Sequence, residues 1–294
     1  MENDICQGGK RMNNLNERGH SRRKWINRIM LGLSGTATAI TILILALILG
    51  YTLVRGISYV NLNMLTQAAK PMGQTGGGMR NEIFGTLILV LLGSVIALPI
   101  GLLSGIFLAE FASPKVAATI RFTADILAGV PSIVVGVFVY AIMVMPMHSY
   151  SALSAGVALA IIMVPVVART AEESLRLVPT SMREAALALG ITRWRAVIGV
   201  VIPGAMTGIV TGIMLGVARI AGETAPLLFT ALGSQFGVQG LSKPIGSLSL
   251  MIYHYALSPY PADQQKAWAG AFLLVLLVLV ISIVVRWVSN RKHV

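Results

Sequence analysis

Uncharged apolar runs, each about as long as a membrane is thick, constrain this chain more than any other feature. A spanning helix needs about 20 apolar residues, and six windows of that kind are present. They lie between Arg28 and Arg55, between Glu82 and Glu110, at 120–144, at 152–172, from about 196 to 220 or toward 232, and at 267–285. The sequence therefore predicts an all-α membrane protein with six transmembrane helices.

The composition agrees with a membrane protein and argues against a soluble one. Only 12% of the 294 residues are charged and the mean hydropathy is +0.78, whereas soluble proteins have roughly 25% charged residues. A net charge of +12 would suit nucleic acid, but the basic residues lie at the ends of the apolar runs. The single cysteine, Cys6, lies in a polar tail, so we expect no disulfide, metal site or redox site.

The basic residues also predict how the chain crosses the membrane. Seventeen Lys and Arg residues fall on the side that holds both termini, and five fall on the other side. Because basic loops stay on the cytoplasmic side, we expect both termini of this multi-pass membrane protein to be cytoplasmic. The predicted segments are a basic N-terminal tail (1–28), a first transmembrane helix (29–55), a five-helix core (83–288) and a C-terminal tail (289–294). We expect a short interfacial helix at 247–257.

The polar segment 178–204 lies between the fourth and fifth spans on the basic side and reads as helix, turn, helix. Ser181 is placed to cap the first helix, with Glu184 as its capping-box partner, and Gly190 is placed to end it. A small alanine-rich helix of this kind can insert into a groove on a partner protein. It can equally rest on lipid as an amphipathic helix, and the physical pattern leaves both possibilities open.

The spacing within this segment resembles the EAA loop of the permeases of ATP-binding-cassette (ABC) importers. The matching residues are Glu184, Ala185, Ala186, Gly190, Val200, Ile202 and Pro203, with Val200 and Ile202 standing for the family's Ile and Leu. The resemblance implies a type I, MetI-like fold in which Glu184, Ala185, Ala186 and Gly190 belong to a cytoplasmic coupling helix. That helix would dock on an ATPase.

The sequence contains no G-x-x-x-x-G-K-[ST] motif for nucleotide phosphates. We therefore expect this chain to be a transporter's membrane subunit, not an enzyme, without a cofactor of its own. ATP would be bound and hydrolysed by a partner chain.

Four ionisable residues compete as candidates for a role within the membrane: Asp125, Arg169, Arg219 and Glu223. Such residues cost a few kcal/mol and face a partner, a cavity or the solute. Asp125 follows Arg121 by four residues, so we expect an intrahelical pair. Arg169 could snorkel to lipid headgroups or line a pathway.

Arg219 and Glu223 have the same four-residue spacing, which fits a plain ion pair. Gly222 and Pro226 favour a break in the helix, however, and an unwound segment at membrane depth is tolerated chiefly where it lines a cavity. An arginine at such a break suits an anionic solute. We therefore expect a place on a solute pathway.

Three segments, 125–140, 175–190 and 218–232, resemble the phosphate-specific permease family of the PstA type, and the likeness covers nearly the whole chain. The resemblance implies pathway residues at Arg169, Arg219, Glu223 and Thr224. It also implies partners: a second permease (PstC-like), an ATPase dimer (PstB-like) and a periplasmic or lipid-anchored phosphate-binding protein (PstS-like).

The expected function is inward transport of inorganic phosphate, driven by ATP on the partner. Glu223 could accept a hydrogen bond from a phosphate hydroxyl, which sulfate lacks, or could simply hold Arg219 in place. The alternatives are an ABC permease for another oxyanion, such as sulfate or molybdate, and an ion-coupled secondary carrier, which would need no coupling helix.

Overall fold

A computed structural model describes residues 2–71, 73–74, 76–234 and 236–290, and within them the side chains from Arg23 to Trp287. Part of the predicted C-terminal tail, residues 291–294, therefore lies outside the described residues. The chain divides into two compact units, Met1–Val54 and Arg55–Val294. Each unit is described by itself.

The first unit consists of most of one long helix, α1 (Glu2–Ile57). Its stretch from Arg23 to Ile57 contains an 18-residue window with a mean hydropathy of 2.4 and is long enough to cross a membrane. An added methyl group at Gly32, Gly35 or Gly50 would meet no other atom. An exposed apolar helix whose backbone groups bond internally is the form that a lipid environment stabilises.

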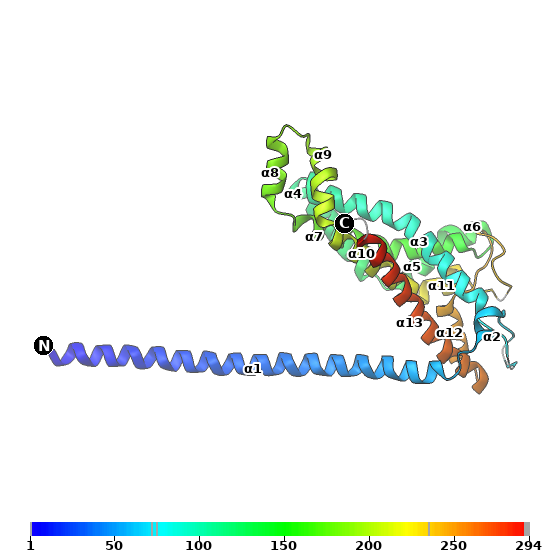
Figure 1. The fold of residues 1–294 in the computed structure, drawn as a ribbon, viewed down its shortest axis with the longest axis horizontal. Coiled ribbons are helices and arrows are strands. Elements are labelled where there is room, and N and C mark those ends of the chain that lie inside the picture. Colours follow the sequence, from blue (N-terminus) through cyan, green and yellow to red (C-terminus); the bar gives the residue numbers. More distant parts are fainter. Residues whose placement is uncertain (1, 72, 75, 235, 291–294) are drawn as a thin grey trace. The chain divides into compact units, whose positions relative to one another are not determined.

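The second unit contains the remaining helices, and the described residues form no strand beyond an isolated bridge between Leu232 and Ile245. The helices are α2 (Leu62–Thr66), α3 (Arg80–Ile106), α4 (Pro114–Gly129), α5 (Ser132–Val139), α6 (Met145–Met147), α7 (Ala152–Arg176), α8 (Thr180–Ala188), α9 (Arg193–Ala196), α10 (Ile202–Ala221), α11 (Ala225–Thr230), α12 (Leu248–Ala256) and α13 (Pro261–Asn290). Three π-helical segments also occur: η1 (Phe107–Phe111), η2 (Tyr140–Val144) and η3 (Val197–Val201). Within this unit, α8 and α9 lie at one end and α2, α6 and α12 at the other (Figure 1).

Among the residues that the structure describes, five helical stretches are long and apolar enough to cross a membrane: Arg23–Ile57, Arg80–Phe111, Ala152–Arg176, Arg193–Ala221 and Pro261–Trp287. The predicted all-α membrane fold is thereby confirmed. A sixth span exists only if the bent pair formed by α4 and the helix that begins with α5 is counted as one.

The third span, predicted over 120–144, is a bent pair of helices. The chain bends by 96° between Pro114–Gly129 and Ser132–Met147. Pro131 explains the bend, because proline lacks an amide hydrogen and forces the preceding residue out of the helical region. Val130 accordingly has extended torsions, with φ −66° and ψ 130°.

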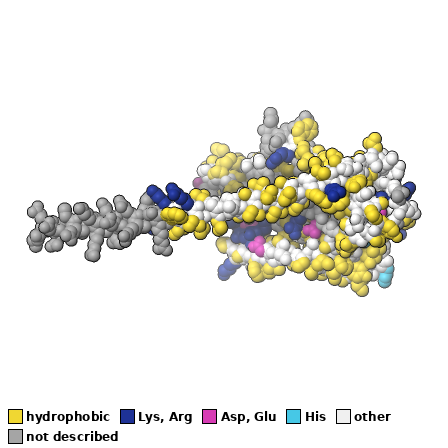
Figure 2. Space-filling view, turned by 90° about the horizontal axis from the view of Figure 1, so that it is seen from below, with side chains coloured by type: hydrophobic (Ala, Val, Ile, Leu, Met, Phe, Trp, Pro, Cys, Tyr) yellow, Lys and Arg dark blue, Asp and Glu magenta, His cyan; other side chains and the backbone are white. Residues whose placement is uncertain are grey.

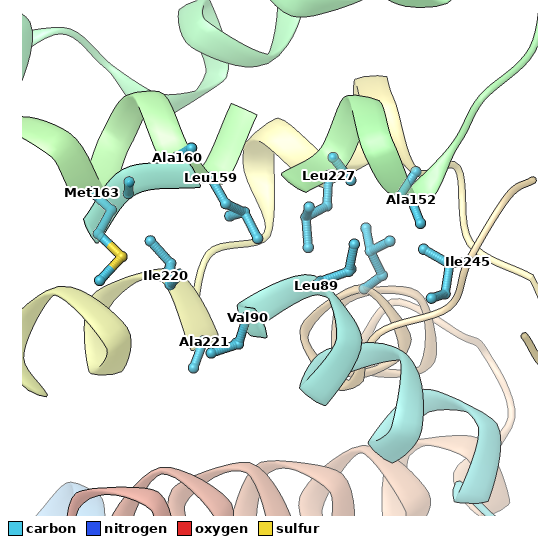
Figure 3. Close-up of a cluster of buried hydrophobic side chains, with 14 of the residues drawn as sticks. Leu89, Val90, Ala152, Leu159, Ala160, Met163, Ile220, Ala221, Leu227 and Ile245 are labelled. Carbon is cyan, nitrogen blue, oxygen red and sulfur yellow. The ribbon is translucent and has the colours of Figure 1, made fainter. Parts of the chain in front are cut away.

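The core of the second unit forms where α3, α7 and α10 pack together (Figure 3). Leu89 of α3, Leu159 and Met163 of α7 and Ile220 of α10 are each at most 1% exposed. Leu227 of α11 joins them at 2% exposed. These contacts fix the position of the break between α10 and α11 relative to the other spans.

A stripe of glycines lets α10 lie directly against α7. An added methyl group at Gly208 would overlap Ser174, one at Gly212 would overlap Thr170, and one at Gly216 would press on Met163. Small residues at every fourth position are typical of helices that pack closely inside membranes. The order of these contacts shows that the two helices run antiparallel.

The predicted helix at 247–257 is present as α12, capped by the Ser247 hydroxyl. Its apolar side chains do not simply rest at an interface. Leu248, Leu250 and Met251 are at most 6% exposed, and α12 packs against α13 and α3. The helix is therefore part of the folded unit.

Candidate functional site

The long helix α10 stops where the sequence predicts a break. It ends at Ala221 with Gly222 as the C-cap residue, and α11 starts at Ala225 with Pro226 in its first turn. Proline supplies no amide hydrogen and suits the first turn of a new helix. Residues 222–224 therefore form a short unwound segment between two helices.

Arg219, in the last turn of α10, and Glu223, within the unwound segment, form a loose ion pair. Arg219 Nε lies 3.8 Å from Glu223 Oε1, and the side chains are 46% and 16% exposed. The Ser249 hydroxyl donates a hydrogen bond of 2.9 Å to the Glu223 carbonyl, which holds the segment against α12. Within the described residues, the Thr224 hydroxyl makes no hydrogen bond. Arg219 is thus half-exposed and weakly neutralised.

Arg169 lies at a different level and is more fully neutralised. Its Nε is 3.2 Å from Asp125 Oδ1, and its Nη1 is 3.4 Å from Glu172 Oε2. Its neighbour Thr170 faces Gly212 of α10, and Arg219 follows Gly212 by seven residues. At about 1.5 Å per residue, the two arginines are separated by about 10 Å along the helix axis.

The expected pair between Arg121 and Asp125 is wrong. Arg121 Nε instead contacts Glu172 Oε1 at 2.6 Å, and Asp125 contacts Arg169. Arg176 also reaches Glu172 Oε1, at 3.0 Å. Arg121 and Asp125 lie on α4, and their partners lie on α7. The four-residue spacing of Arg121 and Asp125 could therefore not reveal these partners.

Glu172, which the sequence analysis missed, is the centre of this cluster. Its side chain is 2% exposed and receives all three arginines. A buried carboxylate needs such partners because water cannot reach it. Figure 2 shows one face of the molecule, where acidic and basic side chains form small groups among broad apolar areas.

The predicted coupling helix is present as α8, one element of a helix, turn, helix loop. Glu184 and Ala185 are exposed and Ala186 is buried. Gly190 ends the helix as predicted, with φ +77° and its amide donating to the Leu187 carbonyl at 2.9 Å. A positive φ at this position favours glycine over any other residue.

The expected capping role of Ser181 is wrong. The helix begins earlier, at Thr180, so Ser181 lies inside its first turn. The cap position is taken by Pro179, and no side chain there accepts a hydrogen bond from the helix. A proline cap position supplies extended torsions without a capping oxygen.

A pocket of about 180 Å³ lies at the end of the unit opposite α8 and α9. Glu82 lines it and is 4% exposed, and its Oε2 has no hydrogen-bond partner among the described residues. Burial, with the charges of Glu82 and Asp263 nearby, raises the pKa of Tyr255 to about 12. The Tyr255 hydroxyl therefore stays protonated and donates to the Lys70 carbonyl at 3.2 Å.

Comparison with known proteins identifies the family. The family described as "Binding-protein-dependent transport system inner membrane component" matches residues 98–294. The "Phosphate transport system permease protein PstA" of Yersinia pestis is 43% identical over 273 residues, which are 92% of each chain. A protein of the same name from Xylella fastidiosa (strain 9a5c) is 42% identical over 294 residues, 96% of this chain and 99% of the relative. The chain belongs to the PstA family of permeases.

The PstA family membership makes the chain a permease subunit of an ABC transporter and a multi-pass protein of the inner membrane. A chain of the MetNI methionine ABC transporter, solved in inward-facing conformations, shares the fold. It matches with a TM-score of 0.52 and 22% identity, over 73% of this chain and 92% of that one. The predicted MetI-like fold is thereby confirmed.

The structure brings together three of the four predicted pathway residues of this PstA-family chain. Arg219, Glu223 and Thr224 share the break between α10 and α11, while Arg169 lies about 10 Å away along the axis. Among the residues that the structure describes, no group of three or more His, Cys, Asp or Glu side chains is placed to hold a metal ion.

Proposed function

We propose that this chain is the transmembrane subunit through which an ATP-driven importer moves inorganic phosphate inward. The observation that carries the proposal is the loose pair between Arg219 and Glu223 at the break in α10, at 3.8 Å and with Arg219 half-exposed. Family membership supports it, because the relatives from Yersinia pestis and Xylella fastidiosa are named phosphate transport system permeases.

The chemistry at the break suits an oxyanion. A guanidinium offers several donors in a planar fork that matches phosphate oxygens, and Arg219 is neutralised only by a carboxylate 3.8 Å away. The Thr224 hydroxyl can donate a further hydrogen bond from the same segment. A phosphate hydroxyl can in turn donate to Glu223, which sulfate cannot do.

Arg169 provides a second contact nearer the cytoplasmic end of the pathway. Its pair with Asp125 is open to solvent, with side chains 32% and 56% exposed. An ion pair of this kind is weak, so an incoming phosphate can compete with Asp125 for the guanidinium. Phosphate would pass from Arg219 to Arg169 before release.

The coupling loop would bind the ATPase. Met182, Leu187, Leu189 and Trp194 are 45%, 47%, 81% and 54% exposed, which is the apolar surface that a helix presents to a groove on a partner. On this proposal both termini and the loop are cytoplasmic, and ATP is bound only by the partner. The partners are a PstB-like ATPase dimer, a PstC-like second permease and a PstS-like phosphate-binding protein, with no cofactor in this chain.

ATP-dependent uptake of radiolabelled phosphate into proteoliposomes that contain all partners tests the proposal. We expect uptake with the native chain and a loss of about tenfold or more for Arg219→Ala, because a hydrogen-bonded charge contributes about 1.5–3 kcal/mol. Lys243→Ala removes an exposed charge from the loop before α12 and should transport normally.

The same vesicles separate the alternatives. Uptake of sulfate or molybdate in preference to phosphate would reject the assignment of the solute. Uptake by this chain without its ATPase would instead indicate an ion-coupled carrier. Equal uptake by Arg219→Ala and the native chain would remove Arg219 from the pathway.

A further inference from the structure

Arg183 on the coupling helix and Glu110 at the end of the second span form a buried ion pair that the sequence analysis did not predict. Arg183 Nε and Nη2 donate to Glu110 Oε1 at 3.0 and 2.8 Å. The side chains are 21% and 6% exposed. A charge-assisted pair in a buried place has a fixed geometry, because neither charge can turn to water instead.

The Arg183 guanidinium also donates hydrogen bonds to backbone carbonyls at the C-terminal end of α7. Arg183 Nη2 donates to the Leu175 carbonyl at 2.7 Å, and Nη1 donates to the Val178 carbonyl. These carbonyls lie at the C-terminal end of a helix, where a cation is favoured by unpaired acceptors and by the helix dipole. One side chain of α8 thus holds two spanning helices.

The second helix of the loop holds Glu110 as well. Arg193 of α9 donates from Nη2 to the Glu110 carbonyl, and its guanidinium lies 5.4 Å from the centre of the Phe111 ring. Both helices of the coupling loop therefore contact η1: α8 contacts Glu110, and α9 contacts Glu110 and Phe111. Little else in the described part of the chain ties α8 to the second span.

The backbone at this point is itself unusual. Phe107–Phe111 is π-helical, and so is Val197–Val201, directly after α9. π-Helical turns are rare and often occur at functional sites. The helix α3, which directly precedes η1, runs through the core and packs most extensively against α7. A displacement of Glu110 would therefore be passed through α3 to the helices packed around it.

We propose that the Arg183–Glu110 pair is the joint that carries motion of the coupling loop into α3, making both of them positioning residues for transport. This inference rests on the proposed function and adds residues outside the EAA pattern. When the ATPase moves α8, the pair makes α3 follow, whereas without it α8 can move and leave α3 behind while it stays joined to α7 and in contact with η3. Loss of the pair would uncouple ATP hydrolysis from transport.

The test compares Arg183→Gln and Glu110→Gln with the native chain in the reconstituted complex, with phosphate uptake and ATP hydrolysis measured in the same vesicles. We expect phosphate moved per ATP to fall by about fivefold or more, within the range of typical coupling energies, while ATP hydrolysis stays within about twofold. The double variant should be no worse than Arg183→Gln alone, because Arg183→Gln already removes the interaction with Glu110. Lys115→Gln, an exposed residue in the first turn of α4, is the matched control.

Arg183→Lys keeps the charge but loses the fork, and it should restore part of the ratio of phosphate to ATP. A parallel fall of uptake and hydrolysis, with an unchanged ratio, would overturn the proposal. The proposal would also be overturned if Arg183→Gln failed to assemble while Arg183→Lys transported fully, because the positive charge would then be needed for assembly alone. If the native complex moves no phosphate, the proposed function fails instead.

Discussion

Asp125 on α4 and Arg169 on α7 form an exposed ion pair, whereas Glu172, three residues further along α7, is buried beneath it. The distances from Arg169 are 3.2 Å to Asp125 and 3.4 Å to Glu172, but the carboxyl side chains are 56% and 2% exposed. The two carboxylates therefore differ in role. We therefore expect Asp125 to be exchangeable and Glu172 to be structural.

Replacing Asp125 by Asn should tighten the apparent affinity for phosphate, because the anion no longer competes with a carboxylate for Arg169. Exposed pairs contribute about 0.2–1 kcal/mol, so we expect KM for phosphate uptake to fall by up to about fivefold. Glu173→Gln removes an exposed carboxylate from α7 and serves as the control. An unchanged KM would mean that Arg169 does not contact the solute.

Replacing Glu172 by Gln should destabilise the fold strongly. Three arginines would then surround a neutral amide, and breaking a buried ion pair costs about 3–5 kcal/mol. Thermal unfolding of the purified chain in detergent measures the effect, again with Glu173→Gln as control. Equal unfolding temperatures for the two variants would contradict the central place of Glu172.

Replacing Gly212 by Ala should weaken the packing of α10 on α7, because the new methyl group would overlap the Thr170 side chain. Overpacking of this kind costs about 1–3 kcal/mol. Gly32→Ala on α1, where no atom lies within 4 Å, is the matched control and should cause no loss. The prediction fails if both variants unfold at the temperature of the native chain.

Replacing Glu223 by Gln should reduce the preference for phosphate over sulfate. A carboxylate repels sulfate but accepts a hydrogen bond from phosphate, and a hydrogen bond to a charged group is worth about 1.5–3 kcal/mol. Inhibition of phosphate uptake by sulfate should therefore become about tenfold stronger. Glu223→Asp, which keeps the charge, should retain more of the preference, and identical inhibition in all three proteins would leave Glu223 as a partner of Arg219 alone.

The spanning helices were predictable because their length and lack of charge are properties of single segments. The break between α10 and α11 was also predictable from a single segment, because Gly222 and Pro226 lie within it. The bend at Val130 was missed although Pro131 marks it, because the apolar run continues from Ile126 through the proline to residue 144 without a charge.

The contacts between helices in the charged clusters were not predictable, because the partners lie far apart in the sequence, whereas Arg169 and Arg176 reach Glu172 from three and four residues away on α7. Glu172 receives Arg121 across 51 positions, and Glu110 receives Arg183 across 73. Rules for pairs four residues apart select the wrong partner in such cases, as they did for Asp125. Only the packing of α4 against α7 and the contact of α8 with η1 bring these side chains together.

The glycine stripe on α10 has a consequence for how the two pathway arginines can act. Gly208, Gly212 and Gly216 press the backbone of α10 onto α7, and interlocked backbones cannot slide past one another without separating. Arg169 on α7 and Arg219 on α10 therefore belong to one rigid helix pair. We expect the distance between their Cα atoms to stay constant through the transport cycle. We expect the helices that face these two arginines to move between outward-open and inward-open states, so that access alternates while the distance between the arginines stays the same.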